Sequence, residues 1–326
     1  MVSVIIPNYN RSQYLKQALQ SVMDQTYSNW EALVIDDGST DDSKTIVNEF
    51  AITDSRIVWL ERKNKLKGAS VCRNIGINNA KGTYVVFLDS DDLLAPHCLQ
   101  QRTQFMKTNP DLDFSVFKMQ FFVEAIGDDD RLWNLKTNEN ELQRFLNLDS
   151  VWQTTGPIWK TQALKKIGGF NPELECWQDI DIHLKALSSN LNYQLCYSLP
   201  VDCYYRKNST GSISQVHTNS LSKLESKRKL YYWLNERFDS SDFNIKQIPL
   251  HILISAINGH QKRFYKQFYG QVISLFSKQD QKRVRQMARI NFYRLNKLQR
   301  FERRFSELKN SLIKHSSIGK FKINDA

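Results

Sequence analysis

The sequence predicts an α/β protein in which helices flank a mostly parallel central sheet, followed by an α-helical C-terminal extension. Two observations predict this class. The first hundred residues alternate short apolar runs with segments of helical spacing, and such alternation builds a parallel sheet with right-handed crossovers. Residues 251–326 instead show helical periodicity together with strong positive charge.

The predicted strands are four apolar runs with no polar alternation, at residues 2–6, 32–35, 57–60 and 84–88. Such runs suit strands that are covered on both faces. Between the first two strands, Leu15, Leu19 and Val22 recur at helical spacing, and Ile46 and Phe50 do so after the second. We therefore expect amphipathic helices that cover the sheet, and a further helix that contains Arg73.

Acidic residues follow two of these strands. Asp36 and Asp37 come after the second, and the tetrapeptide at 89–92 (Asp-Ser-Asp-Asp) comes after the fourth. Ligands of open α/β sheets bind beyond the carboxyl ends of the strands, and carboxylate oxygens suit Mg²⁺ or Mn²⁺ carrying a diphosphate. The alternative is a solvated turn whose aspartates cap a helix that begins near Pro96. No glycine-rich phosphate loop follows the first strand, which excludes the dinucleotide and P-loop signatures.

Four segments, at 2–10, 34–41, 72–77 and 80–92, strongly resemble the inverting family-2 glycosyltransferases of GT-A fold. The resemblance covers about residues 1–215 and implies a GT-A-like domain. It implies that Asp91, with Asp89, holds Mn²⁺ or Mg²⁺, and that Asp92 contacts acceptor or sugar. Residues implied to bind the nucleotide sugar are Pro7, Tyr9, Asp37, Arg73, Asp89, Ser90 and Asp92. Structural alternatives remain for three of them: Asp37 as a helix N-cap, Tyr9 in the core and Arg73 as a surface cation.

A second part of the resemblance lies at 155–160 and 168–171, where the family has its acceptor-side strand and the turn before the catalytic helix. It implies that Asp179 is the general base and that Trp177, Gln178 and Asp181 lie on the acceptor side. Family members commonly have Glu-Asp where this chain has Gln178 and Asp179. Asp181 is the rival carboxylate, and Asp179 has an alternative role as a first-turn aspartate stabilised by the helix dipole. For His183 we expect a structural role.

The implied chemistry needs two acidic sites. Direct displacement requires a base for the acceptor hydroxyl and a group that stabilises the leaving diphosphate, which a divalent cation does without a general acid. We therefore expect a metal-dependent inverting hexosyl- or N-acetylhexosaminyl-transferase that uses a UDP-sugar in surface polysaccharide or lipid-linked glycan synthesis. The alternatives are a sugar nucleotidyltransferase and an inactive nucleotide-sugar- or membrane-binding module.

Three segments are expected along the chain: a nucleotide-sugar half at 1–105, an acceptor and catalytic half at 106–215, and a basic helical domain at 216–326. Five cysteines, odd in number and without C-x-x-C spacing, indicate neither a disulfide framework nor zinc. No signal peptide precedes the first strand, and no apolar run reaches about 18 residues. These features predict a cytoplasmic protein.

The basic excess belongs to the C-terminal part, since residues 251–326 hold 17 Lys and Arg but 4 Asp and Glu. From Val284 to Leu312 apolar residues step by three or four, which predicts one long basic amphipathic helix. It either packs internally or against a second subunit, lies on an anionic membrane, or binds nucleic acid, the least favoured reading because no such module is visible. A capping box at Ser222–Glu225 predicts another helix, and the loop 206–212 is either a flap over the phosphates or a solvated loop.

Overall fold

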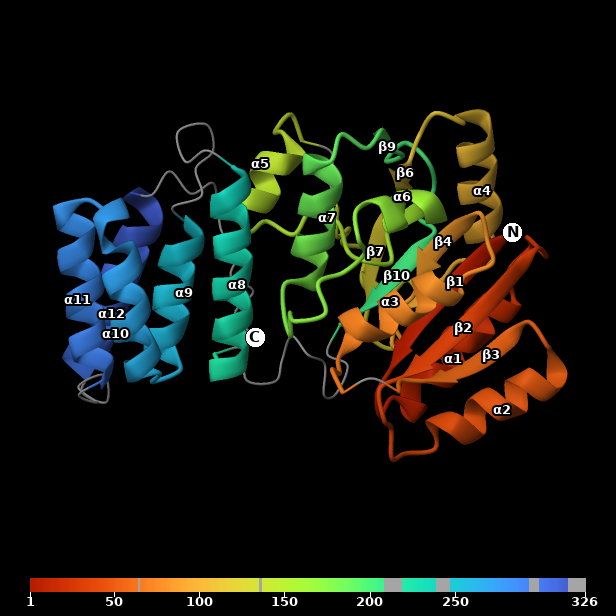
Figure 1. The fold of residues 1–326 in the computed structure, drawn as a ribbon, viewed down its shortest axis with the longest axis horizontal. Coiled ribbons are helices and arrows are strands. Elements are labelled where there is room, and N and C mark those ends of the chain that lie inside the picture. The colour runs from red at the N-terminus through yellow and green to blue at the C-terminus, as the bar shows by residue number, and fades with distance from the viewer. Residues whose placement is uncertain (64, 135–136, 208–218, 239–246, 293–298, 316–326) are drawn as a thin grey trace. The chain divides into compact units, whose positions relative to one another are not determined.

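In the computed structural model, residues 2–195 contain a seven-stranded sheet in the order β3-β2-β1-β4-β8-β6-β9 (Figure 1). The first four strands along the chain are parallel, which confirms the predicted α/β class. Strand β8 runs antiparallel to β4 and β6, and β9 runs parallel to β6. The strands are β1 (Val2–Asn8), β2 (Trp30–Asp36), β3 (Ile57–Glu61), β4 (Tyr84–Phe87), β6 (Phe114–Val116), β8 (Pro157–Lys160) and β9 (Tyr193–Leu195).

Side-chain alternation along β1 assigns its two faces to different helices. Val4 and Ile6 join the core that also contains the buried residues Leu15 and Leu19 of α1 (Ser12–Met23). Ile5 points the other way, toward α3 (Ala69–Asn79), where a Cβ on Gly76 would overlap it. Helices on both faces explain why these strands are continuously apolar. The remaining helices of this region are α2 (Ser43–Thr53), α4 (Cys98–Thr108), α6 (Thr161–Lys166) and α7 (Gln178–Ser188).

A smaller sheet places a second strand end beside the acidic loop. In it β10 (Cys203–Arg206) lies antiparallel to β5 (Leu93–Leu94) and parallel to β7 (Met119–Phe122). Because β5 follows directly after Asp92, this pairing brings the end of β10 to the loop at 89–92.

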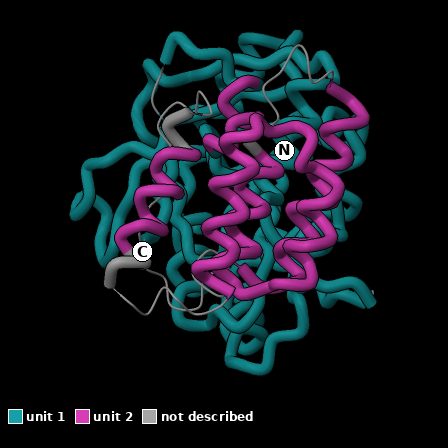
Figure 2. Tube along the Cα trace, turned by 90° about the vertical axis from the view of Figure 1, so that its left-hand side faces the viewer, with its two compact units in different colours: residues 1–142, 150–210 teal, residues 143–149, 211–326 magenta. Residues whose placement is uncertain are grey.

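The structure describes residues 1–63, 65–134, 137–207, 219–238, 247–292 and 299–315. The chain divides into two units (Figure 2): unit 1 comprises Met1–Leu142 and Ser150–Thr210, and unit 2 comprises Gln143–Asp149 and Gly211–Ala326. The short helix α5 (Glu141–Leu146) spans this division. Nothing in the division separates residues 1–105 from 106–215, so that boundary stays a prediction.

Unit 2 is helical, with α8 (Leu221–Arg237), α9 (Gln247–Asn258), α10 (Lys262–Val272), the 3₁₀ turn η1 (Ile273–Leu275), α11 (Lys278–Phe292) and α12 (Gln299–His315). The expected capping box at Ser222 is wrong by two residues, because Ser220 caps α8 by accepting from the Lys223 N–H. None of the helices among the described residues is both long and apolar enough to cross a membrane.

The expectation of one long helix from Val284 to Leu312 is also wrong. The structure has two helices, α11 and α12, which pack against each other (Figure 1). At the two ends of the predicted stripe, Val284 is 0% and Leu312 is 1% exposed. A continuous helix of this length would leave most of that stripe in water.

Candidate functional site

The carboxyl ends of β1 and β2 lie level, with Asn8 in register with Asp36. Asp36 is buried, and its Oδ2 accepts hydrogen bonds from the backbone N–H groups of Gly38 (2.9 Å) and Ser39 (2.8 Å). Gly38 has φ +98°, in the left-handed region that glycine adopts at little cost. This turn holds Asp37 just beyond the strand.

Asp37 is tied to the start of α3. Its Oδ1 accepts from Arg62 Nε at 2.5 Å, and its Oδ2 accepts from the Gly68 N–H at 2.8 Å, next to the first residue of that helix. The alternative of Asp37 as a helix N-cap is wrong, because the N-cap residue of α2 is Asp42 and that of α3 is Gly68. Tyr9, at the neighbouring strand end, is 57% exposed, so its alternative as a core residue is wrong. Pro7 is buried within β1.

Arg73 joins the acidic loop to the helix of the expected base. Its Nη2 donates to Asp89 Oδ1 at 2.5 Å, and its Nη1 donates to Gln178 Oε1 at 3.0 Å. At 5% exposure Arg73 is no surface cation, so that alternative is wrong. Gln178 in turn donates from Nε2 to the Leu174 carbonyl at 2.9 Å. A neutral amide at position 178 serves both contacts, since it has an acceptor for Arg73 and a donor for the carbonyl.

Asp92 anchors the acidic loop. It is 1% exposed and accepts from the Arg206 N–H at 3.1 Å and from Thr155 Oγ1 at 3.2 Å. Burial, followed by the negative charges of Asp91 and Asp89, raises the pKa of Asp92 well above its usual range. These contacts favour an anchoring role over the expected contact with acceptor or sugar. The helix-cap alternative for the loop is wrong, because the N-cap of α4 is His97 and makes no side-chain cap bond.

Asp91 is the loop carboxylate that best suits a metal. Its side chain is 17% exposed and lies 3.9 Å from Arg11 Nε, and its carbonyl accepts from Arg206 Nε at 2.9 Å. Within the described part of the chain, no three His, Cys, Asp or Glu side chains converge as a metal-binding group. The loop offers the carboxylates of Asp89 and Asp91, and a cation of the Mg²⁺ type takes one or two protein carboxylates and completes its shell with substrate phosphates and water. Ser90, between the two candidate ligands, is buried.

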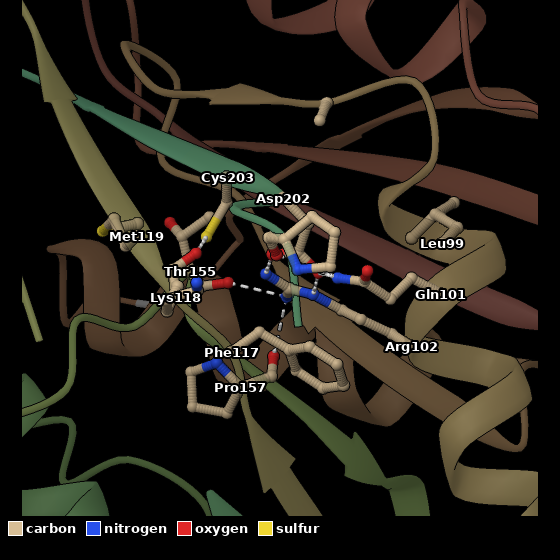
Figure 3. A network of polar contacts seen from close by, with 12 residues as sticks. Leu99, Gln101, Arg102, Phe117, Lys118, Met119, Thr155, Pro157, Asp202 and Cys203 are labelled. Atoms are coloured by element: carbon tan, nitrogen blue, oxygen red, sulfur yellow. Dashed lines mark hydrogen bonds and ion pairs between the residues drawn. The ribbon is translucent and has the colours of Figure 1, made fainter. Parts of the chain in front are cut away.

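A buried ion pair stands behind this loop (Figure 3). Arg102 of α4 and Asp202, which precedes β10, are both 0% exposed and pair through Nη2 to Oδ1 (2.7 Å) and Nε to Oδ2 (2.9 Å). Arg102 Nη1 also donates to the Thr155 carbonyl at 2.8 Å. Because the hydroxyl of Thr155 donates to Asp92, the pair supports the acidic loop through one intervening residue.

Asp179 lies in the first turn of α7, after Trp177, whose φ of +61° is left-handed. Ser150 Oγ donates to its Oδ2 at 2.5 Å, and burial raises the pKa of Asp179. The rival Asp181 is 1% exposed and is held by Lys185 Nζ (2.8 Å) and the Asn171 N–H (2.9 Å). These internal contacts give Asp181 a structural role and favour Asp179 as the candidate base.

The turn before α7 is fixed to the helix that carries Arg73. Gly168 and Gly169 both have positive φ, and Asn74 donates to the Phe170 carbonyl (2.8 Å) while accepting from its N–H (2.9 Å). His183, farther along α7, is buried against Trp159, and burial lowers its pKa to about 3. It is therefore a neutral core residue.

Hydrogen bonds thus link Asp89 to Arg73 and Arg73 to Gln178. Along the sequence, Asp91 lies two residues after Asp89, and Asp179 directly follows Gln178. Sequence reasoning missed Arg11, Arg62 and Ser150 as partners of the candidate aspartates. No local pattern marks them, since the contacts of Arg62 and Ser150 span 25 and 29 residues. Of the loop expected as a flap, 208–212 lies outside the described residues.

Comparison with known families identifies proteins of similar sequence. Residues 3–164 match the family described as glycosyl transferase family 2. A glycosyltransferase of Haemophilus influenzae is 26% identical over 277 residues, which cover 84% of this chain and 92% of that protein. The putative teichuronic acid biosynthesis glycosyltransferase TuaG of Bacillus subtilis is 41% identical over 108 residues, 32% of this chain and 42% of TuaG. A Rickettsia bellii glycosyltransferase, 44% identical over 108 residues, is much longer, and the match spans 15% of it.

Solved structures share the fold. Staphylococcus aureus TarS 1–349 in complex with UDP-GlcNAc superposes with a TM-score of 0.66 at 20% identity, over 95% of this chain and 92% of that one. The mannosyltransferase PcManGT of Pyrobaculum calidifontis, in complex with GDP-Man and Mn²⁺, gives a TM-score of 0.53 at 15% identity, over 97% and 86%. The likeness to TarS covers both the sheet and the helical C-terminal region.

Proposed function

The chain belongs to glycosyl transferase family 2, and on that premise we propose that it is a metal-dependent inverting glycosyltransferase. It moves a sugar from a nucleoside-diphosphate sugar, with a UDP-sugar as the favoured donor, to a hydroxyl of a glycan acceptor. The observation that carries the proposal is the chain of contacts from Asp89 through Arg73 to Gln178. It couples the acidic loop after β4 to the first turn of α7, where Asp179 lies.

The donor is assigned to the carboxyl-end edge of β1, β2 and β4. Exposed Tyr9 is the side chain that the base would stack on, and Asp37 is held beside it for the ribose. Two solved structures of the same fold contain UDP-GlcNAc and GDP-Man, which supports a nucleotide sugar as donor. Members of this fold class bind ligands at this edge of the sheet.

Asp91, with Asp89 beside it, is assigned to Mn²⁺ or Mg²⁺, and such a cation neutralises charge on the leaving diphosphate. Asp89 already pairs with Arg73, so Asp91 is the principal ligand of the proposal. Arg206 donates from Nε to the Asp91 carbonyl, and its backbone N–H donates to the carboxylate of Asp92. The protein therefore supplies a fixed backbone and at most two carboxylates, which matches how Mg²⁺ sites are built around substrate phosphates.

We assign Asp179 the role of general base, which takes the proton from the acceptor hydroxyl. Burial raises its pKa, which strengthens it as a base relative to an ordinary carboxylate. Ser150 Oγ orients the carboxylate by donating to Oδ2, and we assign Oδ1 to the acceptor. Attack by that hydroxyl on the anomeric carbon, opposite the diphosphate, forms the glycosidic bond with inversion as the carbon–oxygen bond to the diphosphate breaks. Trp177 and Gln178 flank the acceptor in this arrangement.

One relative supports our choice of acceptor class. TuaG is described as acting in teichuronic acid biosynthesis, and a surface polysaccharide or lipid-linked glycan made on the cytoplasmic side is the acceptor that we propose. The transferred sugar is a hexose or an N-acetylhexosamine. Family membership favours glycosyl transfer over the alternative of nucleotidyl transfer.

Thermal unfolding of the full chain with a panel of nucleotide sugars, with and without Mn²⁺, tests the proposal. A ligand at about a hundred times its Kd stabilises the native state by about 2.7 kcal/mol, and at about 2–4 °C per kcal/mol the Tm rises by roughly 5–11 °C. Asp91→Ala should lose the Mn²⁺-dependent rise. Asp111→Ala, at an exposed aspartate between α4 and β6, is the control and should keep the Mn²⁺-dependent rise. An equal rise in Asp91→Ala refutes the metal assignment, and no rise with any nucleotide sugar refutes the donor.

A further inference from the structure

Helices α10 and α11 of unit 2 carry an unbalanced set of exposed cations. On α11, Lys278, Lys282, Arg285 and Arg289 are all exposed and follow the spacing i, i+4, i+7 and i+11, which places them on one face of the helix. The single acidic residue of α11, Asp280, is half-buried and is paired with Arg283 at 2.9 Å. The face is therefore positive, with no exposed carboxylate on this helix to neutralise it.

Helix α10 also carries exposed cations. It contains no acidic residue, and its three cations, Lys262, Arg263 and Lys266, are exposed. The two helices touch, since the rings of Tyr265 and Phe292 lie 5.3 Å apart between centroids. Figure 1 shows both helices in the blue, C-terminal part of the molecule. Seven exposed cations thus lie on two helices in contact.

The apolar side chains of these helices point inward. Phe264, Phe268, Val284 and Met287 are at most 4% exposed. Among the described residues of unit 2, the exposed large hydrophobic side chain is Leu221 on α8. The apolar side chains of α10 and α11 are therefore buried within the protein and are not free to enter a lipid interface.

We propose that the exposed cations of α10 and α11 hold the protein on an anionic lipid bilayer by electrostatic contact with the headgroups, without insertion. Single-stranded nucleic acids are bound by grooves that combine cations with exposed aromatic platforms, and the aromatic rings of both helices are buried or half-buried. A surface of cations alone matches a partner that presents only negative charge, and polybasic segments bind the anionic leaflet in this way.

Cosedimentation of the full chain with vesicles tests the proposal. Vesicles of phosphatidylcholine with phosphatidylglycerol should bind the protein at low salt and release it at high salt, because exposed charges are screened within about 10 Å at 0.1 M and about 3 Å at 1 M ionic strength. Vesicles of phosphatidylcholine alone should not bind it. Salt-resistant binding to the neutral vesicles means insertion and overturns the proposal.

A matched pair of variants tests whether the exposed cations of α11 cause the binding to vesicles. The variant Lys278→Gln, Lys282→Gln, Arg285→Gln and Arg289→Gln removes four charges from α11, and each cation is worth roughly a fivefold factor in partitioning. We expect binding to anionic vesicles to weaken by roughly 600-fold. The control, Lys81→Gln, Lys107→Gln, Lys165→Gln and Lys166→Gln, removes four exposed charges from unit 1 and should bind like the wild type.

Two further outcomes overturn the proposal. Equal weakening in both quadruple variants means that net charge, and not the α11 face, sets the binding. Salt-sensitive binding to heparin or single-stranded DNA, together with no binding to anionic vesicles at low salt, identifies a soluble polyanion as the partner. Circular dichroism and thermal unfolding confirm that each variant is folded, which we expect because all eight substituted side chains are exposed.

Discussion

Replacement of Arg102 by methionine breaks the buried ion pair behind the acidic loop. Arg102 and Asp202 are both 0% exposed, so the variant leaves the Asp202 carboxylate without its cation in a site closed to water. It also removes the donor to the Thr155 carbonyl. Loss of one partner of a buried pair costs about 3–5 kcal/mol, and at about 2–4 °C per kcal/mol the Tm of the chain falls by roughly 6–20 °C.

The assay is thermal unfolding followed by circular dichroism on three variants. Arg102→Met should show the full loss. Arg102→Met with Asp202→Asn removes both charges and should recover most of it, since the penalty comes from the uncompensated carboxylate. Arg131→Met breaks an ion pair in which the arginine is 67% exposed and should change the Tm little. A single variant as stable as the wild type, or a double variant less stable than the single one, refutes this reasoning.

Three further predictions concern other parts of the chain. Gln178→Glu puts a negative charge beside Asp179 and should raise the pH midpoint of transfer, measured from the pH profile of the initial rate; an unchanged midpoint separates Gln178 from the base. Burial lowers the pKa of His183 to about 3, so below about pH 6.5 the unfolded chain binds a proton that the folded chain does not. The free energy of unfolding therefore falls with pH, by about 1.4 kcal/mol per pH unit at most. Between pH 7 and pH 5, denaturant unfolding should show a smaller loss of stability in His183→Phe than in the wild type, and an equal loss contradicts the burial argument. Ser220→Ala removes the cap of α8 and should cost about 1 kcal/mol, whereas Ser222→Ala should cost much less, and the reverse order restores the capping box first expected.

The strand ends that carry the site could be predicted because each is a local pattern. A buried strand has to be apolar on both faces, and the polar residues that follow it mark the edge of the sheet. Asp37 and Asp89 were placed correctly at such ends. The partner of Asp92 was not predictable by the same reasoning, because its contact with Arg206 spans 114 residues and depends on the pairing of β10 with β5.

The helical region shows a related limit. Periodicity predicted that apolar residues from Val284 onward share a helical face, and of these Val284, Ala288 and Leu312 are buried as expected. Periodicity carries no information on where a helix ends when neither glycine nor proline marks the end. The division into two packed helices, α11 and α12, was therefore missed.

Transfer catalysed by Asp179→Asn is the measurement that tests the central claim most directly, because the substitution keeps the shape of the side chain and removes the base. With a nucleotide sugar and acceptor that the wild type uses, the initial rate should fall by about 10²–10⁴-fold. Donor affinity, measured by calorimetry in the presence of Mn²⁺, should stay nearly unchanged, since Asp89, Asp91 and Arg73 are intact. Transfer at the wild-type rate by Asp179→Asn would contradict the account and move the base to another residue.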